Sequence, residues 1–96
     1  MPYHATYGIY CGVSPGFGVK YPDYVEERTL LPAKNDCEAF EEAMAQARLF
    51  AQDYLSDPEA GLTTVQLLRL TGPTGAIAFD PRRAIATCSM LEHFLQ

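Results

Sequence analysis

Apolar and polar residues alternate along the first part of the chain. Over residues 3–11, one set of alternate positions carries Tyr3, Ala5, Tyr7, Ile9 and Cys11, and the other carries His4, Thr6, Gly8 and Tyr10. A period of two is the pattern of a strand with one buried face. Residues 24–31 alternate in the same way with more charge, which predicts a more exposed partner strand that ends at Pro32. We expect these two strands to form a hairpin with a long tip.

A helix is predicted after this hairpin. Asn35 and Glu38 have the spacing of an Asn-led capping box, acidic residues fill the first turn, and Pro58 bars continuation. The apolar positions recur at steps of three and four and are Phe40, Ala43, Met44, Ala47, Phe50, Ala51 and Tyr54. The outward positions are Glu38, Glu41, Glu42, Gln46 and Asp53. One stripe is therefore expected to pack on the sheet.

The second half reads as a hairpin followed by a short helix. Turn chemistry in TGPTG separates LTTVQLLRL from AIAFD, which predicts a tight hairpin over residues 63–79. Asp80 and Pro81 are residue types typical of an N-cap and of a first helical position. Apolar residues then recur at steps of three and four, which predicts a short helix over residues 82–95. AIATC could instead be extended, because Arg82 and Arg83 in a first turn oppose the helix dipole.

These elements predict an α+β fold in the order ββαββα. The sheet would be mostly antiparallel and four-stranded, with two helices packed on one face. A chain of 96 residues is long enough for one hydrophobic core, so we expect residues 1–96 to form a single domain.

Composition and the N-terminal residues suggest a cellular location. Hydrophobic residues make up 48% and charged residues 20%, as in an ordinary globular domain. The N-terminus has no basic region before an apolar run, and no stretch approaches membrane-spanning length. We expect a cytoplasmic protein that does not bind membranes.

Metal and cofactor sites are not indicated. Cys11, Cys37 and Cys88 are widely spaced without a CxxC pair, and only His4 and His93 could join them. The glycine-rich stretch of residues 7–24 lacks the spacing and the following helix that phosphate-binding loops need. Its glycines suit a hairpin tip better.

The negative charge is concentrated in residues 23–59. This segment has ten acidic and three basic residues, a net charge of −7, within a chain of net charge −5. Such a protein repels phosphate backbones, so direct nucleic-acid binding is not expected. The acidic helix, with Glu38, Glu41 and Glu42 facing outward, is either a solvated surface or a mimic of phosphate that binds a nucleic-acid-binding protein.

Aromatic residues gather around the predicted hairpin tip. Tyr10, Phe17, Tyr21 and Tyr24 lie close together in the sequence, and amphipathic rings on a stiffened loop are typical of surfaces that meet a partner. Alternatively, the loop folds back and these rings cover the open face of the hairpin.

Two further sets of residues suggest interactions. Arg69, Arg82 and Arg83 could bind an anion or a carboxylate on a partner. The short uncharged strand AIAF could pair with a second copy and form a homodimer.

The start of the chain offers an enzymatic alternative. Removal of Met1 would leave Pro2 as a secondary amine, which can act as a general base in an apolar pocket. With MPY and GLTTVQLL, the chain resembles the tautomerase superfamily, and this resemblance implies keto-enol chemistry at Pro2 and a strand, helix and parallel strand in succession. The chain departs from that pattern in the inserted second strand and in Gln66, where an arginine is common.

From these patterns we expect a small nonenzymatic interaction or regulatory module that binds a protein partner. The tyrosine-rich loop and the exposed side of the first hairpin would make the contact. The acidic phosphate mimic and the tautomerase-like enzyme are the alternatives.

Overall fold

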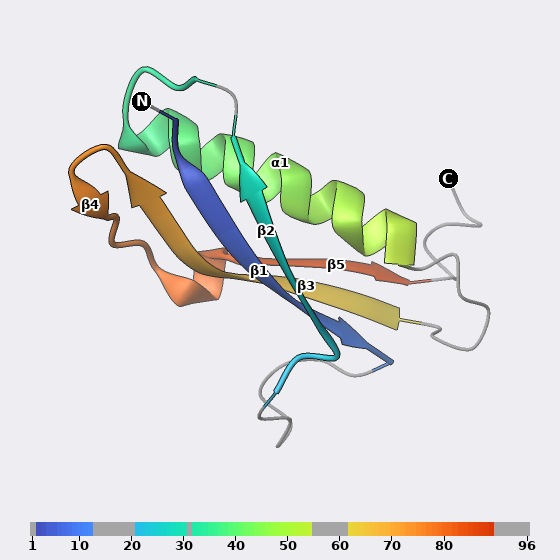
Figure 1. Ribbon diagram of the computed structural model, residues 1–96. Coiled ribbons are helices and arrows are strands. Elements are labelled where there is room, and N and C mark those ends of the chain that lie inside the picture. Colours follow the sequence, from blue (N-terminus) through green and yellow to red (C-terminus); the bar gives the residue numbers. More distant parts are fainter. Residues whose placement is uncertain (1, 13–20, 31, 55–61, 90–96) are drawn as a thin grey trace.

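The computed structural model describes residues 2–12, 21–30, 32–54 and 62–89 (Figure 1). The elements are β1 (His4–Cys11), β2 (Tyr24–Thr29), α1 (Asp36–Tyr54), β3 (Leu62–Gly72), β4 (Gly75–Ala76), the 3-10 helix η1 (Pro81–Arg83) and β5 (Ile85–Ser89). The α+β class and the antiparallel sheet predicted from the sequence are confirmed.

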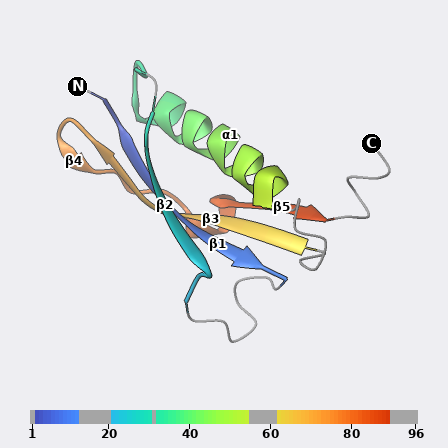
Figure 2. The same ribbon diagram turned by 45° about the vertical axis from the view of Figure 1, so that its right-hand side comes forward.

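The sheet is built around two long central strands. Strand β1 lies between β2 and β3, and both β4 and β5 pair with β3 toward its opposite ends. Every pairing is antiparallel, so β2 and β3 run parallel to each other on either side of β1. Helix α1 connects β2 to β3 and lies along one side of the sheet in both Figure 1 and Figure 2. Among the described residues, no helix covers the other side, which we call the open face.

The core lies between α1 and the facing side chains of the sheet. Tyr7, Ile9 and Val65 are fully buried there, and α1 contributes small residues such as Ala43 and Ala47 that let the helix approach closely. The Tyr7 hydroxyl donates a 2.8 Å hydrogen bond to the Ala43 carbonyl oxygen. Burial raises the pKa of Tyr7 well above its usual value of 10.0. Tyr7 thus ties the central strand to the middle of the helix.

Helix α1 begins as the sequence predicts. The Asn35 side-chain oxygen accepts a 2.8 Å hydrogen bond from the Glu38 backbone N–H, as an N-cap does. Glu38 reaches back to the Lys34 N–H rather than to that of Asn35, so the capping box is displaced by one residue. The predicted apolar stripe faces the core, with Phe40 and Tyr54 half-buried at its ends.

The predicted C-terminal helix is wrong. Asp80 does cap a helical turn, but this turn is η1, and the chain then enters β5, which pairs with β3 from Leu62 to Gln66. The β-branched residues Ile85 and Thr87 favour a strand, and β5 supplies backbone partners that this part of β3 would otherwise lack. Residues 90–95 of the predicted helix lie outside the described residues.

The second hairpin is shorter than predicted. β4 contains only Gly75 and Ala76, and Gly75 has a φ of +120°, a conformation that favours glycine at the turn. Ile77 still donates its N–H to the Leu70 carbonyl, but residues 78–80 leave the sheet. Only Ala76 of AIAF therefore lies in an edge strand, and a homodimer through this segment stays a prediction.

Within the described ranges, no helix is long and apolar enough to cross a membrane.

Candidate functional site: the open face of the sheet

The open face carries a row of exposed apolar side chains. Directly paired residues of neighbouring strands share a face, so Val25 on β2, Gly8 on β1, Gln66 on β3 and Ile85 on β5 form one row across the sheet. Val25 is 59% exposed and Ile85 is 39% exposed. The row crosses four strands and is therefore about 14 Å wide.

A β-bulge adds Leu68 to this row. The register of β1 and β3 shifts between Thr6, which pairs with Arg69, and Tyr7, which pairs with Leu67. Leu68 is the extra residue, and its side chain is 43% exposed while Leu67 is buried. Bulges commonly re-aim side chains in this way. We call Val25, Leu68 and Ile85 the apolar row.

The segment before β2 extends this apolar surface. A Cβ atom on Gly8 would lie 3.2 Å from both a Leu68 methyl carbon and the Pro22 Cβ. Pro22 and Leu68 therefore pack over Gly8 so closely that any larger residue there would crowd them. Asp23 holds the segment to β1, because its carboxylate accepts a 2.7 Å hydrogen bond from Cys11 N–H and its own N–H donates to Ile9 O.

The other half of the open face is polar. A shallow hollow of about 500 Å³ is lined by His4, Thr6, Glu27, Arg28, Thr29, Arg69 and Thr71. Thr6 pairs with Glu27 on one side and Arg69 on the other, so these two opposite charges flank it across three strands. Thr29 Oγ1 and His4 Nδ1 are 3.3 Å apart. The open face therefore joins an apolar row to a polar area with both signs of charge.

The predicted aromatic contacts separate into three groups. Tyr21 is 82% exposed, and Tyr24 is 53% exposed and packs on Tyr54 with ring centroids 5.2 Å apart. Tyr10 is only 5% exposed and its hydroxyl donates to Gln66 Oε1, so its ring is not available on the surface as predicted. Phe17 lies outside the described residues. Of the described predicted contacts, Tyr21 and Tyr24 are thus exposed, but Tyr24 lies on the α1 side of the sheet because it pairs with the core residue Ile9.

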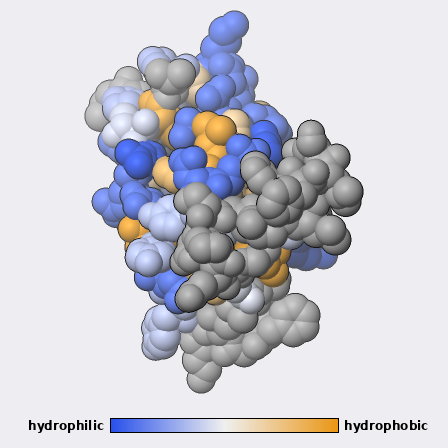
Figure 3. Space-filling view, turned by 90° about the vertical axis from the view of Figure 1, so that its right-hand side faces the viewer, coloured by the Kyte–Doolittle hydropathy of each residue, from blue (hydrophilic) through white to orange (hydrophobic). Residues whose placement is uncertain are grey.

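The acidic helix residues lie away from the open face. Glu41 is exposed, whereas Glu38 and Glu42 are half-buried on α1. At the end where α1 and β5 finish, Figure 3 shows hydrophobic residues as small separate areas among hydrophilic ones. Because α1 lies on the other side of the sheet, these three glutamates do not adjoin the apolar row.

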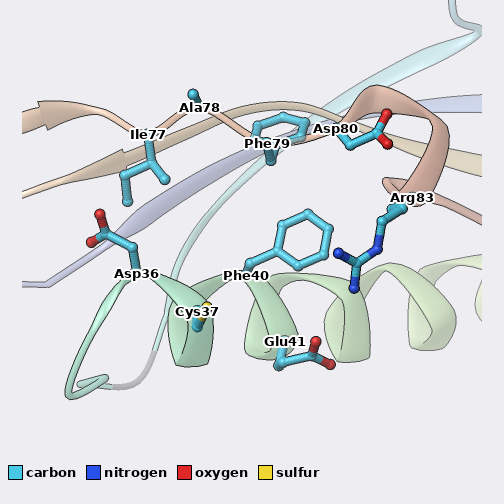
Figure 4. Close-up of a pocket in the computed structure, with 9 residues that line it drawn as sticks. All are labelled: Asp36, Cys37, Phe40, Glu41, Ile77, Ala78, Phe79, Asp80 and Arg83. Atoms are coloured by element: carbon cyan, nitrogen blue, oxygen red, sulfur yellow. The ribbon is translucent and has the colours of Figure 1, made fainter.

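The three predicted anion-binding arginines are not brought together. Arg69 lies on the open face, whereas Arg82 and Arg83 lie on η1, beside α1. The Arg82 side chain forms an ion pair with Asp80, with Nε 3.2 Å from Oδ1. Hydrogen bonds from the Arg82 side chain and backbone N–H hold the pKa of Asp80 below its usual value. Arg83 instead lines a separate hollow with Phe40 (Figure 4).

The structure departs from the tautomerase pattern. β1 and β3 are antiparallel, whereas the resemblance implies a parallel pair, and β2 intervenes before the helix. Pro2 is exposed before β1 rather than enclosed in an apolar pocket. The geometry therefore gives no support to a general base at Pro2. Within the described ranges, no cluster of three or more His, Cys, Asp or Glu side chains is placed to hold a metal ion.

Leu68 and Ile85 were not identified from the sequence. The doublet Leu67-Leu68 interrupts the alternation of β3, and this interruption is a signal of a bulge. Ile85 falls within residues 82–95, for which the apolar spacing predicts a helix and not an exposed strand position. In comparisons with known proteins, no family model, no curated protein and no solved structure matches the chain.

Proposed function

We propose that this chain is a small nonenzymatic module that binds a protein partner through the open face of its sheet. The observation that supports this most directly is the apolar row, in which Val25 on β2, Leu68 on β3 and Ile85 on β5 are all exposed on the same face of the sheet. An antiparallel sheet with one wet face usually carries polar side chains there. Apolar side chains gathered in one row are more typical of a surface that a partner covers.

The expected contact has an apolar centre and a polar border. When a partner covers the exposed parts of Val25, Leu68 and Ile85, the hydrophobic effect stabilises the complex by roughly 25 cal/mol per Å² of apolar area removed from water. Glu27 and Arg69 at the border would fix the orientation of the partner through complementary charges. Tyr21 extends the surface beside Pro22, and a tyrosine ring suits an interface because one end is apolar and the other polar.

Affinity capture with matched variants tests this proposal. The tagged chain and its Leu68→Asp variant are used to capture partners from the native cell extract. Leu49→Asp is the control, because Leu49 is 52% exposed on α1. We expect one stoichiometric protein to be retained by the unmodified chain and by Leu49→Asp, and to be lost with Leu68→Asp. Circular dichroism should show that both variants remain folded.

The salt response distinguishes the acidic alternative. Binding through the apolar row should change little when ionic strength rises, because salt screens exposed charges and not apolar contacts. The proposal would be contradicted if Leu68→Asp still captured the partner and if the partner were released at high salt. That result would favour binding through the acidic surface of α1 that includes Glu41.

A further inference from the structure

A second hollow lies on the other side of the molecule, between the start of α1 and the chain that leads into η1. Its volume is about 210 Å³, and its apolar wall consists of Phe40, Ile77, Ala78 and Phe79. The rings of Phe40 and Phe79 pack at 5.8 Å between centroids, inclined at 40° (Figure 4). This volume is smaller than the roughly 300–1,000 Å³ typical of sites for drug-sized ligands, so it suits a small molecule.

One guanidinium group borders this hollow without a carboxylate partner. Arg83 Cζ lies 5.9 Å from the centre of the Phe40 ring. Arg28 pairs with Glu26 and Arg82 pairs with Asp80, and Arg83 takes part in neither of these ion pairs. A guanidinium that rests on a ring presents a planar fork of N–H donors, which matches the two oxygens of a carboxylate.

Two of the three acidic residues that line the hollow accept hydrogen bonds from other side chains. Figure 4 shows the Glu41 carboxylate turned away from Phe79 and the Asp80 carboxylate turned away from Phe40. Asp80 is occupied by Arg82, and Asp36, on the far side of the Phe40 ring, accepts a 3.2 Å hydrogen bond from the Tyr3 hydroxyl. Arg83 is therefore the cationic group of the lining that remains open to a ligand beside the aromatic wall.

We propose that this hollow binds a small molecule that carries a carboxylate on an apolar or aromatic body. The carboxylate pairs with Arg83, and the body packs against Phe40 and Phe79. The charge of Arg83 and the apolar wall are complementary to such a molecule, whereas a neutral analogue would gain only the apolar contact. This site is independent of the open face and does not rest on the proposed interaction there.

Titration with phenylacetate and its neutral analogue phenylacetamide tests the site. Binding is followed by two-dimensional NMR on the full chain, with a dissociation constant for phenylacetate on the order of 1 mM expected for so small a ligand. Phenylacetate should bind about tenfold or more tightly than phenylacetamide, because a hydrogen bond to a charged group is stronger than one between neutral groups. The shifted signals should be those of the residues that line the hollow.

Two arginine variants make the test specific. Arg83→Gln should make the two probes bind about equally, whereas Arg82→Gln, the matched neighbour, should keep the preference for phenylacetate. Glu41→Gln should strengthen phenylacetate binding, since it removes a nearby negative charge without touching the wall. Equal binding of the two probes to the unmodified chain, no binding of phenylacetate, or an unchanged preference in Arg83→Gln would each overturn the proposal.

Discussion

Two buried threonine hydroxyls near the start of β3 allow a quantitative test of the packing. Thr63 and Thr64 are both fully buried, and neither hydroxyl has a hydrogen-bond partner in the part of the chain that the structure describes. Thr63 faces α1 and Thr64 faces the opposite side, because successive side chains of a strand alternate. Among the described residues, neither hydroxyl therefore has a protein partner that replaces its lost hydration.

Replacement of either threonine by valine should stabilise the protein. Valine has nearly the same shape and has no hydroxyl to desolvate, and a buried hydroxyl without a partner costs about 1–3 kcal/mol in protein mutational data. We expect Thr63→Val and Thr64→Val each to raise the free energy of unfolding by about 1 kcal/mol, the low end of that range. For a chain of 96 residues this corresponds to an increase in Tm of about 4–8 °C.

Urea and thermal unfolding followed by circular dichroism would measure these changes. Thr29→Val is the control, since the Thr29 hydroxyl is exposed and lies 3.3 Å from His4 Nδ1. It should change the free energy of unfolding by no more than about 0.5 kcal/mol. A loss of about 1 kcal/mol or more in Thr63→Val or Thr64→Val would refute the reasoning, because it would mean that the hydroxyl is satisfied.

Three further substitutions test separate contacts. Tyr7→Phe removes the hydrogen bond to Ala43 and should lower the free energy of unfolding by about 0.5–1.5 kcal/mol in urea melts. Because the raised pKa of Tyr7 makes the folded protein lose stability as pH rises above 10.0, this variant should also show a shallower alkaline decline. The pKa of Asp80 is lower in the folded than in the unfolded protein, so its ionised carboxylate stabilises the fold above the unfolded pKa, and this stabilisation is lost as pH falls through the folded pKa. Asp80→Asn should therefore be less stable than the unmodified chain at neutral pH and equally stable in acid. Gly72→Ala would place a Cβ 2.8 Å from the Tyr3 ring, and a Tm that does not fall would show that the ring moves aside freely.

The helix and the first hairpin were predictable because their signals are local. Alternation over residues 3–11 and the three- and four-residue spacing from Phe40 to Ala51 each identify one buried face within a single element. Asn35 caps α1 through a contact only three residues away. Such features depend little on the rest of the chain.

The end of the chain was not predictable in the same way, because its structure depends on a distant partner. Ala84 and Cys88 have helical spacing, yet pairing with β3 overrides it. The exposure of Leu68 likewise follows from a bulge against β1, which the Leu67-Leu68 doublet signals but which only pairing with β1 places. The buried ring of Tyr10 and the separation of Arg69 from Arg83 are also consequences of tertiary packing. Much of the candidate surface thus arises from contacts between elements.

The position of α1 on one side of the described sheet gives the open face its importance. Helix α1 covers one side of the sheet, and on the other side Val25, Leu68 and Ile85 are exposed whereas Tyr10 and Thr64 are buried. The bulge at Leu68 and the glycine at position 8 shape that display locally. If the proposal is right, the sheet acts as a rigid platform and the partner completes its second layer.

Site-specific photo-crosslinking is the most direct test of the proposed interaction. A photoreactive phenylalanine analogue replaces Leu68 in one sample and Leu49 in another, and both are irradiated in the native cell extract. The proposal predicts one discrete covalent adduct with a protein from position 68 and none from position 49. Adducts from position 49 alone, or no adduct from position 68, would contradict it.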